Sequence, residues 1–142
     1  MANEATVNSG FSITKSNLKH RSYPTQFQAT VSGSKGPTPG AFTASLLGTQ
    51  VDLSELENPG LCRISNLDSD NFVEWGVYDG NEFYPLGEIL PGEFYVFRLS
   101  RFLGRSIGSS DPGTGTFDLG TYRFMIKATV APCNVSVEAF ER

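Results

Sequence analysis

Short runs in which hydrophobic and polar residues alternate dominate the chain, and Gly and Pro interrupt them at frequent intervals. Alternation with a period of two is typical of β-strands, because successive side chains of a strand point to opposite faces of the sheet. No stretch of 12 or more residues has a clean helical period. The pattern predicts strands at 11–14, 26–31, 41–47, 61–66, 72–78, 83–84, 93–100, 121–130 and 135–139, with 51–54 either a strand or one helical turn that continues to Leu56.

Three features of this pattern predict how particular strands pair. Asp79-Gly80 is the strongest hairpin signal, because Gly tolerates the positive φ of a tight turn. The last two strands, 121–130 and 135–139, are expected to form a hairpin that closes the domain. The strand at 93–100 is apolar on both faces, so we expect it in the centre of a sheet or under a partner.

Segments without this alternation separate the strands. The polar residues 1–10 predict a flexible N-terminal arm, and residues 32–40 predict a loop. The longest segment without alternation is 104–120. It is longer than a simple connection between strands needs to be, so we predict a loop with a functional or contact role.

Eight to nine short strands with turns every 8–12 residues predict an all-β fold, an antiparallel β-sandwich of jelly-roll type. Residues 11–142 are expected to form this single domain after the arm at 1–10. A small closed barrel is the alternative, since alternation alone does not distinguish it from a sandwich.

Composition narrows the function classes. The chain has 142 residues and 17 aromatic side chains, enough for a folded core. Its net charge of −4 argues against a nucleic-acid partner, and no apolar run is long enough for a membrane helix. The first residues lack the basic and apolar regions of a signal peptide, so we expect reduced cysteines.

The charge is unevenly distributed along the chain. Residues 1–51 carry +3, residues 52–93 carry −9 and residues 94–142 carry +2, which together give the net −4. Such asymmetry can reflect complementary faces that meet between copies, although solvated acidic loops would give the same pattern.

The sequence contains no catalytic or metal-binding motif, and we expect no cofactor. His20 is the only histidine and lies in a polar, basic stretch, which favours a surface role over that of a catalytic base. Cys62 is interpreted as a small core residue and Cys133 as a turn residue. The sequence offers no further ligands that would complete a zinc site with them. The segment 68–71 (DSDN) departs from a calcium loop and is interpreted as a turn.

Two weaker possibilities involve acidic and aromatic side chains. A glycosidase needs a pair of carboxylates, but spacing selects no two of the candidates Glu74, Glu82, Glu88 and Glu93. An exposed sugar-binding platform could use Trp75, Tyr78, Phe83 and Tyr84, although alternation directs Trp75 into the core.

The segment from Leu53 to Ser100 carries a resemblance to a known family. It contains Asn58-Pro-Gly-Leu-Cys-Arg-Ile64, Asn66-Leu-Asp68, Asn71-Phe-Val-Glu-Trp-Gly76 and Leu90-Pro-Gly-Glu93, followed by Phe97-Arg-Leu99. These runs resemble small β-sandwich virion accessory proteins of tailed bacteriophages, over about a third of the chain. The resemblance implies a non-enzymatic protein of the virion, assembled in the host cytoplasm, and supplies no catalytic residue.

Within that family the favoured role is capsid decoration, as a cement protein that binds the major capsid protein or other virion proteins and associates with itself. The candidate interface is basic: Lys15, Lys19, Arg21, Arg101 and Arg105, which would meet acidic groups of a neighbouring subunit. The alternatives are a carbohydrate- or receptor-binding module of a tail fibre, a hydrolase domain, and a neck or tail connector.

Overall fold

The computed structural model describes residues 5–31, 33–100 and 122–142, without the side chains of residues 23–25. The chain divides into two compact units, residues 1–32 and 33–142, which are described separately. The described residues form ten strands in three antiparallel sheets and contain no helix. The expected loop at 104–120 lies outside the described residues.

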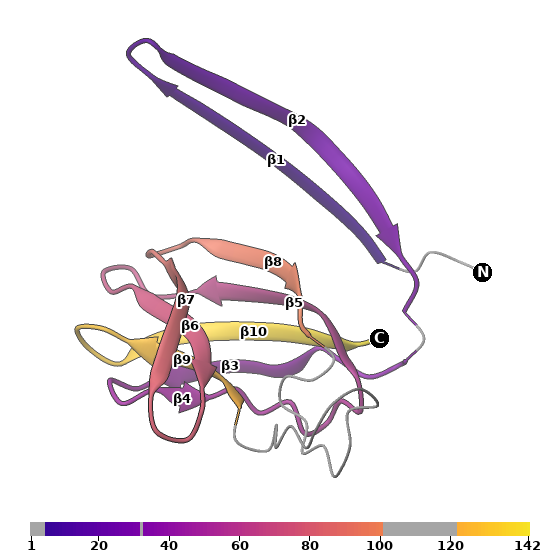
Figure 1. The fold of residues 1–142 in the computed structure, drawn as a ribbon, viewed down its shortest axis with the longest axis vertical. Helices are drawn as coiled ribbons and strands as arrows, with labels where there is room; N and C mark the ends of the chain where they lie inside the picture. Colours follow the sequence, from indigo (N-terminus) through magenta and orange to yellow (C-terminus); the bar gives the residue numbers. More distant parts are fainter. Residues whose placement is uncertain (1–4, 32, 101–121) are drawn as a thin grey trace, which may run out of the picture. The chain divides into compact units, whose positions relative to one another are not determined.

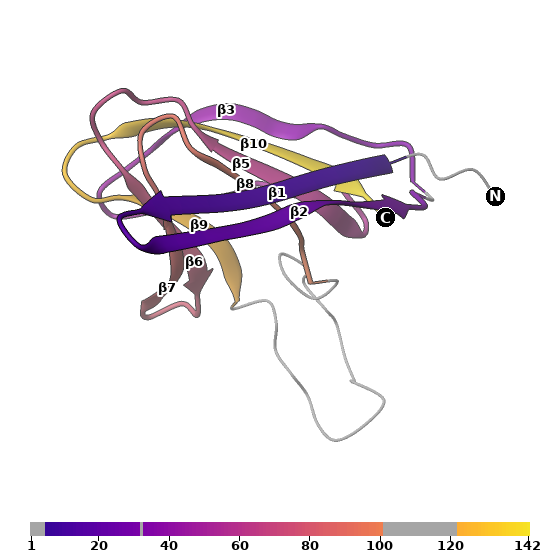
Figure 2. The ribbon, with the colours of Figure 1, turned by 90° about the horizontal axis from the view of Figure 1, so that it is seen from above.

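The first unit is a single β-hairpin. Strand β1 (Ala5–Lys15) pairs antiparallel with β2 (Leu18–Ala29), and the two run side by side over their length (Figure 2). Residues 5–10 therefore belong to a paired strand, where the sequence predicted an arm up to residue 10. The reason is that Ala5 and Val7 stand opposite Ala29 and Phe27, so the alternation begins before Phe11.

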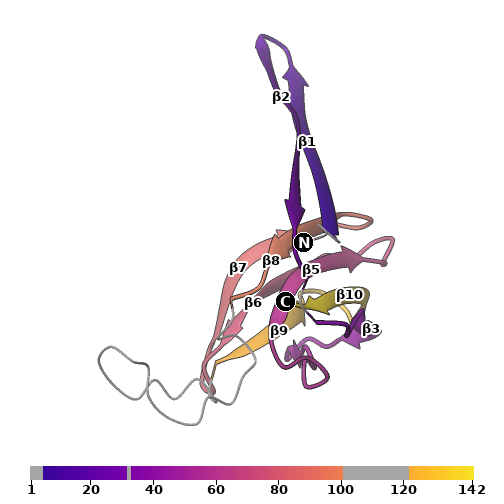
Figure 3. The same cartoon turned by 90° about the vertical axis from the view of Figure 1, so that its right-hand side faces the viewer.

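The second unit is a sandwich of two four-stranded sheets (Figures 1 and 3). One sheet has the order β3-β10-β5-β8 and the other the order β4-β9-β6-β7. The strands are β3 (Thr38–Ala44), β4 (Thr49–Gln50), β5 (Pro59–Asn66), β6 (Val73–Tyr78), β7 (Phe83–Ile89), β8 (Phe94–Arg98), β9 (Arg123–Ala128) and β10 (Cys133–Glu141).

This strand order is that of a jelly roll. The first strand of the body pairs with the last, the second with the seventh, the third with the sixth and the fourth with the fifth. The β5–β10 and β6–β9 pairs then join these ribbons into two sheets. The prediction of an all-β antiparallel sandwich is confirmed, and the sheets do not form a single closed barrel.

The core lies between the two sheets and follows the alternation of the strands. Cys62 and Ile64 of β5 and Val135, Val137 and Ala139 of β10 are buried from one sheet. Val73, Ile89, Phe124, Ile126 and Ala128 are buried from the other. The segment at 51–54 is not a strand: a turn follows in which the amide of Leu56 donates to the carbonyl of Leu53 at 3.0 Å, and Val51, Leu53 and Leu56 are buried in the core.

The hairpin expected at Asp79-Gly80 is present. Strands β6 and β7 pair antiparallel, Gly80 has a φ of 101°, and the amide of Asp79 donates to the carbonyl of Glu82 at 3.2 Å. A side chain at Gly80 would be strained in this backbone conformation.

Two predicted pairings are wrong. Strands β9 and β10 do not form a hairpin, because the short connection at 129–132 crosses from one sheet to the other. Strand β8 is an edge strand and not a central one, since it pairs with β5 alone. One of its faces packs inward, where Phe97 stacks on Trp75, whereas Phe94 and Val96 on the other face are exposed.

Candidate interaction surface

The basic residues of the predicted interface that the structure describes all lie in the β1–β2 hairpin. Lys15 ends β1 opposite Leu18, Lys19 stands opposite Thr14, and Arg21 stands opposite Ser12. The hairpin therefore places these three residues near its turn, with Lys15 on the face of the odd-numbered β1 residues and Lys19 and Arg21 on the other face. Arg101 and Arg105 lie outside the described residues, so their position relative to this group is not part of the structure.

The hairpin has two chemically different faces. Because β1 alternates regularly, its odd-numbered residues share one face with the β2 residues that oppose them. That face, called here the apolar hairpin face, carries Ala5, Val7, Phe11, Ile13, Leu18, Phe27 and Ala29, together with the polar residues Ser9, Lys15, His20 and Ser22. The opposite face is polar and basic, with Thr6, Asn8, Ser12, Thr14, Lys19, Arg21, Gln26 and Gln28.

The apolar hairpin face is largely open to solvent. Phe11 is 55% exposed and Leu18 58%, and Ile13 and Phe27 are also exposed. A two-stranded hairpin is at best marginally stable in water unless another layer covers its apolar side. The hairpin thus has the chemistry of a segment that gains its stability by lying on a partner.

His20 belongs to this hairpin. Its Nε2 lies 3.2 Å from the hydroxyl of Ser22, and its ring packs against Phe11 with centroids 6.1 Å apart. These are the contacts of an exposed residue on a strand, which agrees with the predicted surface position of His20. They include no carboxylate that could orient the ring for acid–base chemistry.

The acidic residues of the body organise turns. One carboxylate oxygen of Asp68 accepts the amides of Asp70 at 2.9 Å and Asn71 at 2.8 Å. These hydrogen bonds to the charged form lower the pKa of Asp68. The predicted turn at 68–71 is confirmed, and the described residues contain no cluster of acidic, His or Cys side chains that could hold a metal ion.

Asp79 likewise accepts backbone amides, at the turn between β6 and β7. Its Oδ1 accepts the amides of Glu82 and Asn81, both at 2.8 Å, and these bonds lower the pKa of Asp79. Its Oδ2 accepts the hydroxyl of Tyr84 at 3.2 Å, and this hydrogen bond, together with the negative charge of Asp79, raises the pKa of that tyrosine. Asp79 is thus committed to holding the turn.

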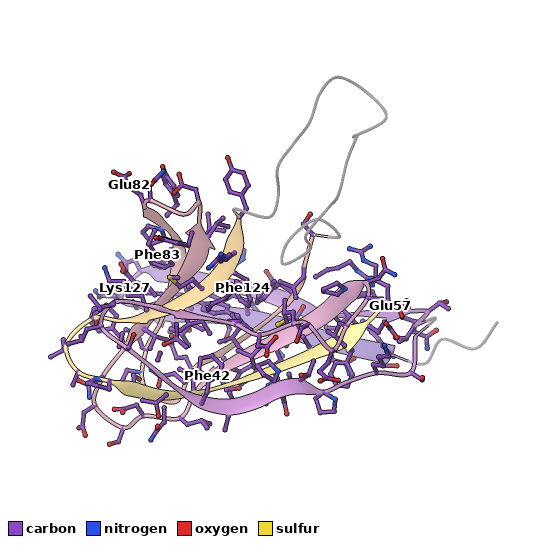
Figure 4. The ribbon with its side chains drawn as sticks, turned by 90° about the horizontal axis from the view of Figure 1, so that it is seen from below. Phe42, Glu57, Glu82, Phe83, Phe124 and Lys127 are labelled. Atoms are coloured by element: carbon purple, nitrogen blue, oxygen red, sulfur yellow. The ribbon has the colours of Figure 1, made fainter. Side chains whose placement is uncertain are left out.

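The glutamates considered for glycoside hydrolysis are dispersed. Glu74 and Glu88 are cross-strand neighbours in the β6–β7 pair, with Lys127 opposite Glu74 on its other side. Glu82 lies at the end of the β6–β7 hairpin beside Phe83 (Figure 4). Glu93 accepts the amide of Leu90 at 3.1 Å in a separate turn. Only Glu74 and Glu88 are brought together.

The aromatic side chains do not form one platform. The ring of Trp75 stacks on Phe97 with centroids 5.0 Å apart and meets the edge of Phe124 at 6.4 Å, so it packs between the sheets as predicted. Gly87 stands opposite Trp75, and a Cβ there would lie 2.8 Å from the indole nitrogen. Tyr84 is exposed on β7 opposite Val77, and Tyr78 stands opposite Phe83 at the end of the hairpin.

Both cysteines are free and buried. The prediction for Cys62 is confirmed, because it packs in the core, and burial raises the pKa of its thiol to about 12. The prediction for Cys133 is wrong: it begins β10 and is fully buried, with its Sγ 3.3 Å from Asn66 Oδ1. Burial raises the pKa of Cys133 to about 11, so neither thiol is a ready nucleophile at neutral pH.

Comparison with protein families, with curated protein sequences and with solved structures found no match. Among the described residues there is also no helix of the length and hydropathy needed to cross a membrane. The arguments about function therefore rest on the residues of the chain itself.

Proposed function

We propose that this protein is a non-enzymatic structural protein of a tailed-phage virion, a capsid decoration protein that binds and stabilises the head lattice. The observation that carries the proposal is the hairpin with its uncovered apolar face and its basic residues near the turn. A decoration protein needs a rigid body and an extended segment that can lie on neighbouring subunits, and both parts are present in the chain.

The charges of the two units support binding between subunits. Residues 1–32 contain three bases and one acid, a net charge of +2, whereas residues 33–142 contain 8 bases and 14 acids, a net charge of −6. Lys15, Lys19 and Arg21 supply all three bases of the first unit. The proposed contact sets them against acidic groups of a capsid subunit or of another copy, which favours association and fixes its orientation.

The resemblance over Leu53 to Ser100 gives the proposal its biological setting. Its motifs lie at turns and strands of the body: Asn58-Pro-Gly60 enters β5, and Pro91-Gly-Glu93 enters β8. Jelly rolls are frequent in viral capsid proteins, but they also occur in lectins and cupins, so the fold by itself does not select this function.

Binding to purified heads that lack the protein tests the proposal. The wild-type chain is expected to sediment with the heads and to saturate at hundreds of copies per particle. Saturation at six or twelve copies would indicate a neck component, and absence of binding would contradict the proposal.

A charge variant tests the role of the hairpin in the same assay. Lys15→Ala/Lys19→Ala/Arg21→Ala is expected to weaken binding about tenfold and to reduce its salt dependence, since surface pairs contribute about 0.2–1 kcal/mol each. Lys35→Ala/Arg123→Ala/Lys127→Ala, which removes the same charge from the body, is the matched control. Equal weakening by both variants would show only a general effect of net charge.

A further inference from the structure

The four edge strands of the sandwich differ in how they are protected against pairing with another chain. Edge strands are normally blunted by Pro, by a bulge, by short length or by charges. Strand β3 contains Pro39, β4 has only two residues, and β7 contains Pro85 beside a register shift. Three of the four edges therefore have a recognised protection.

Strand β8 has no Pro, no bulge and more than the two residues of β4, and its one charged residue is Arg98 at its end. It reads Phe94-Tyr-Val-Phe-Arg98, without Pro or Gly, and pairs with β5 in a continuous register. Phe94 is 56% exposed and Val96 44%, and Tyr95 is also exposed. An open strand edge with exposed apolar side chains is the arrangement that binds an added strand.

The open backbone groups of β8 can be assigned. The amide of Asn66 donates to the carbonyl of Glu93, and that of Leu99 donates to the carbonyl of Gly60, both at 2.9 Å. Because hydrogen-bonded pairs alternate along an antiparallel ladder, Tyr95 and Phe97 direct their backbone groups toward β5. The N–H and C=O groups of Phe94, Val96 and Arg98 consequently point to the open edge.

We propose that β8 pairs antiparallel with β8 of a second copy, with a two-fold axis at Val96. This deepens the proposed function, because it names the contact through which copies associate. Hydrogen bonds can form only between residues whose backbone groups face the open edge. The register that uses all of them sets Phe94 opposite Arg98 of the second copy and Val96 opposite Val96.

The charges at the ends of β8 support this orientation. Glu93 precedes the strand and Arg98 ends it. Antiparallel pairing brings the acidic end of each strand beside the basic end of the other, whereas parallel pairing would place like charges side by side. In addition, Phe94 already accepts a cation on its ring, since the guanidinium of Arg63 lies 4.7 Å from the ring centroid.

The pairing would join the two β3-β10-β5-β8 sheets into one continuous sheet of twice the width. It would satisfy the open backbone groups of β8 and would set its exposed side chains beside those of β8 in the second copy. A second copy is the occupant proposed here, and a different occupant of β8 would be an outcome that overturns the proposal.

Measurement of the oligomeric state in solution is the first test, by sedimentation over a range of concentrations. The wild-type chain is expected to dimerise. Val96→Lys is expected to weaken the dimer by about a hundredfold or more, since it places two like charges together at the axis. Ala41→Lys, on the exposed side of the protected edge β3, is the matched control and should leave the dimer intact. Both substitutions are at the surface, and thermal unfolding would verify that both variants fold.

Cysteine cross-linking is the second test, and it reports the register. Hydrogen-bonded antiparallel partners have Cα atoms about 5.5 Å apart, within the range of a disulfide. Val96→Cys should form an intermolecular disulfide on mild oxidation, whereas Ala41→Cys should not. A mixture of Phe94→Cys and Arg98→Cys chains should cross-link, but either chain alone should not. The native Cys62 and Cys133 are buried and should not compete.

A monomer at all concentrations would overturn the proposal, as would a dimer that survives Val96→Lys and resists cross-linking at Val96. These results are independent of the proposed function, because no phage particle is present. Conversely, a β8 dimer that does not bind heads would contradict the decoration role and leave the pairing intact.

Discussion

The hairpin and the jelly-roll body use similar side chains in opposite ways. In the body, the apolar residues of facing strands meet between two sheets and are fully buried, as Ile64 and Val137 illustrate. In the hairpin, the apolar face has no second layer within its own unit, and Phe11 and Phe27 stay exposed. The comparison teaches that alternation alone specifies a strand, whereas a second layer is what makes the strand stable.

The largest expected difference between the two regions is in amide hydrogen exchange. Amides of β5 and β10 should exchange only by global unfolding, which for a domain of this size costs about 5–15 kcal/mol. Amides of β1 and β2 should exchange by local opening at about 1 kcal/mol or less, because few buried contacts hold the hairpin. Exchange followed by mass spectrometry would measure both. Equal protection in the two regions would mean that the hairpin is covered in solution.

The next largest difference is expected in the free energy of unfolding, when one isoleucine of each region is replaced by alanine. Ile126 is fully buried, so Ile126→Ala should lower the free energy of unfolding by about 2–5 kcal/mol. Ile13 is 38% exposed in the hairpin, and Ile13→Ala should cost about 0.5 kcal/mol or less. Urea unfolding measures both values. A large cost at Ile13 would mean that the hairpin contributes to the stability of the body.

A smaller effect is expected from the polar anchor of the body, Asn66. Its buried amide donates to the carbonyls of Asn71 at 2.8 Å and Ile89 at 3.0 Å. Asn66→Ala would remove this donor from both carbonyls and should cost about 1–3 kcal/mol.

Asn134 is the matched control for this substitution. Its amide oxygen accepts the hydroxyl of Thr43 at 3.0 Å on the exposed side of the sheet. Asn134→Ala should change stability by only about 0.5 kcal/mol, because water can replace the lost partner. Equal costs for the two substitutions in urea unfolding would show that Asn66 is not a buried anchor.

The strands of the body were predictable where one face is buried and the other is open. The predictions of 61–66 and 72–78 match β5 and β6 to within two residues, because inward residues such as Ile64 and Val73 alternate with polar ones. The prediction of a central position for strand β8 was wrong. Apolar residues on both faces of a strand do not show whether the strand lies in the centre of a sheet or at its edge. The sequence also does not determine which strand pairs with which. The short connection before Cys133 is compatible with a hairpin and with a crossover to the other sheet.

The candidate interface was predictable only in part. Charge alone selected Lys15, Lys19 and Arg21, and the strand register then placed them near one turn. The apolar hairpin face was missed, because polar residues such as Asn8 and Ser9 obscured the alternation that begins at Ala5. Looking for Ala5, Val7, Phe11 and Ile13 as one odd-numbered series would have found it.

The smallest expected effect is the pH dependence of the body, which the acidic turns confer. The folded state holds the pKa of Asp68 and Asp79 below the ordinary value of 3.8, through hydrogen bonds from backbone amides. Depressed pKa values contribute stability that is fully present above the unfolded pKa and is lost as the pH falls through the folded pKa. The urea midpoint of the body should therefore be level from pH 7 to about pH 5 and decline below about pH 4.

Asp68→Asn/Asp79→Asn keeps side-chain acceptors for the turns but removes the titration, so its midpoint should decline less steeply. Ser69→Ala, which leaves both aspartates in place, should retain the wild-type slope, and an unchanged slope in the double variant would assign the acid sensitivity to other carboxylates.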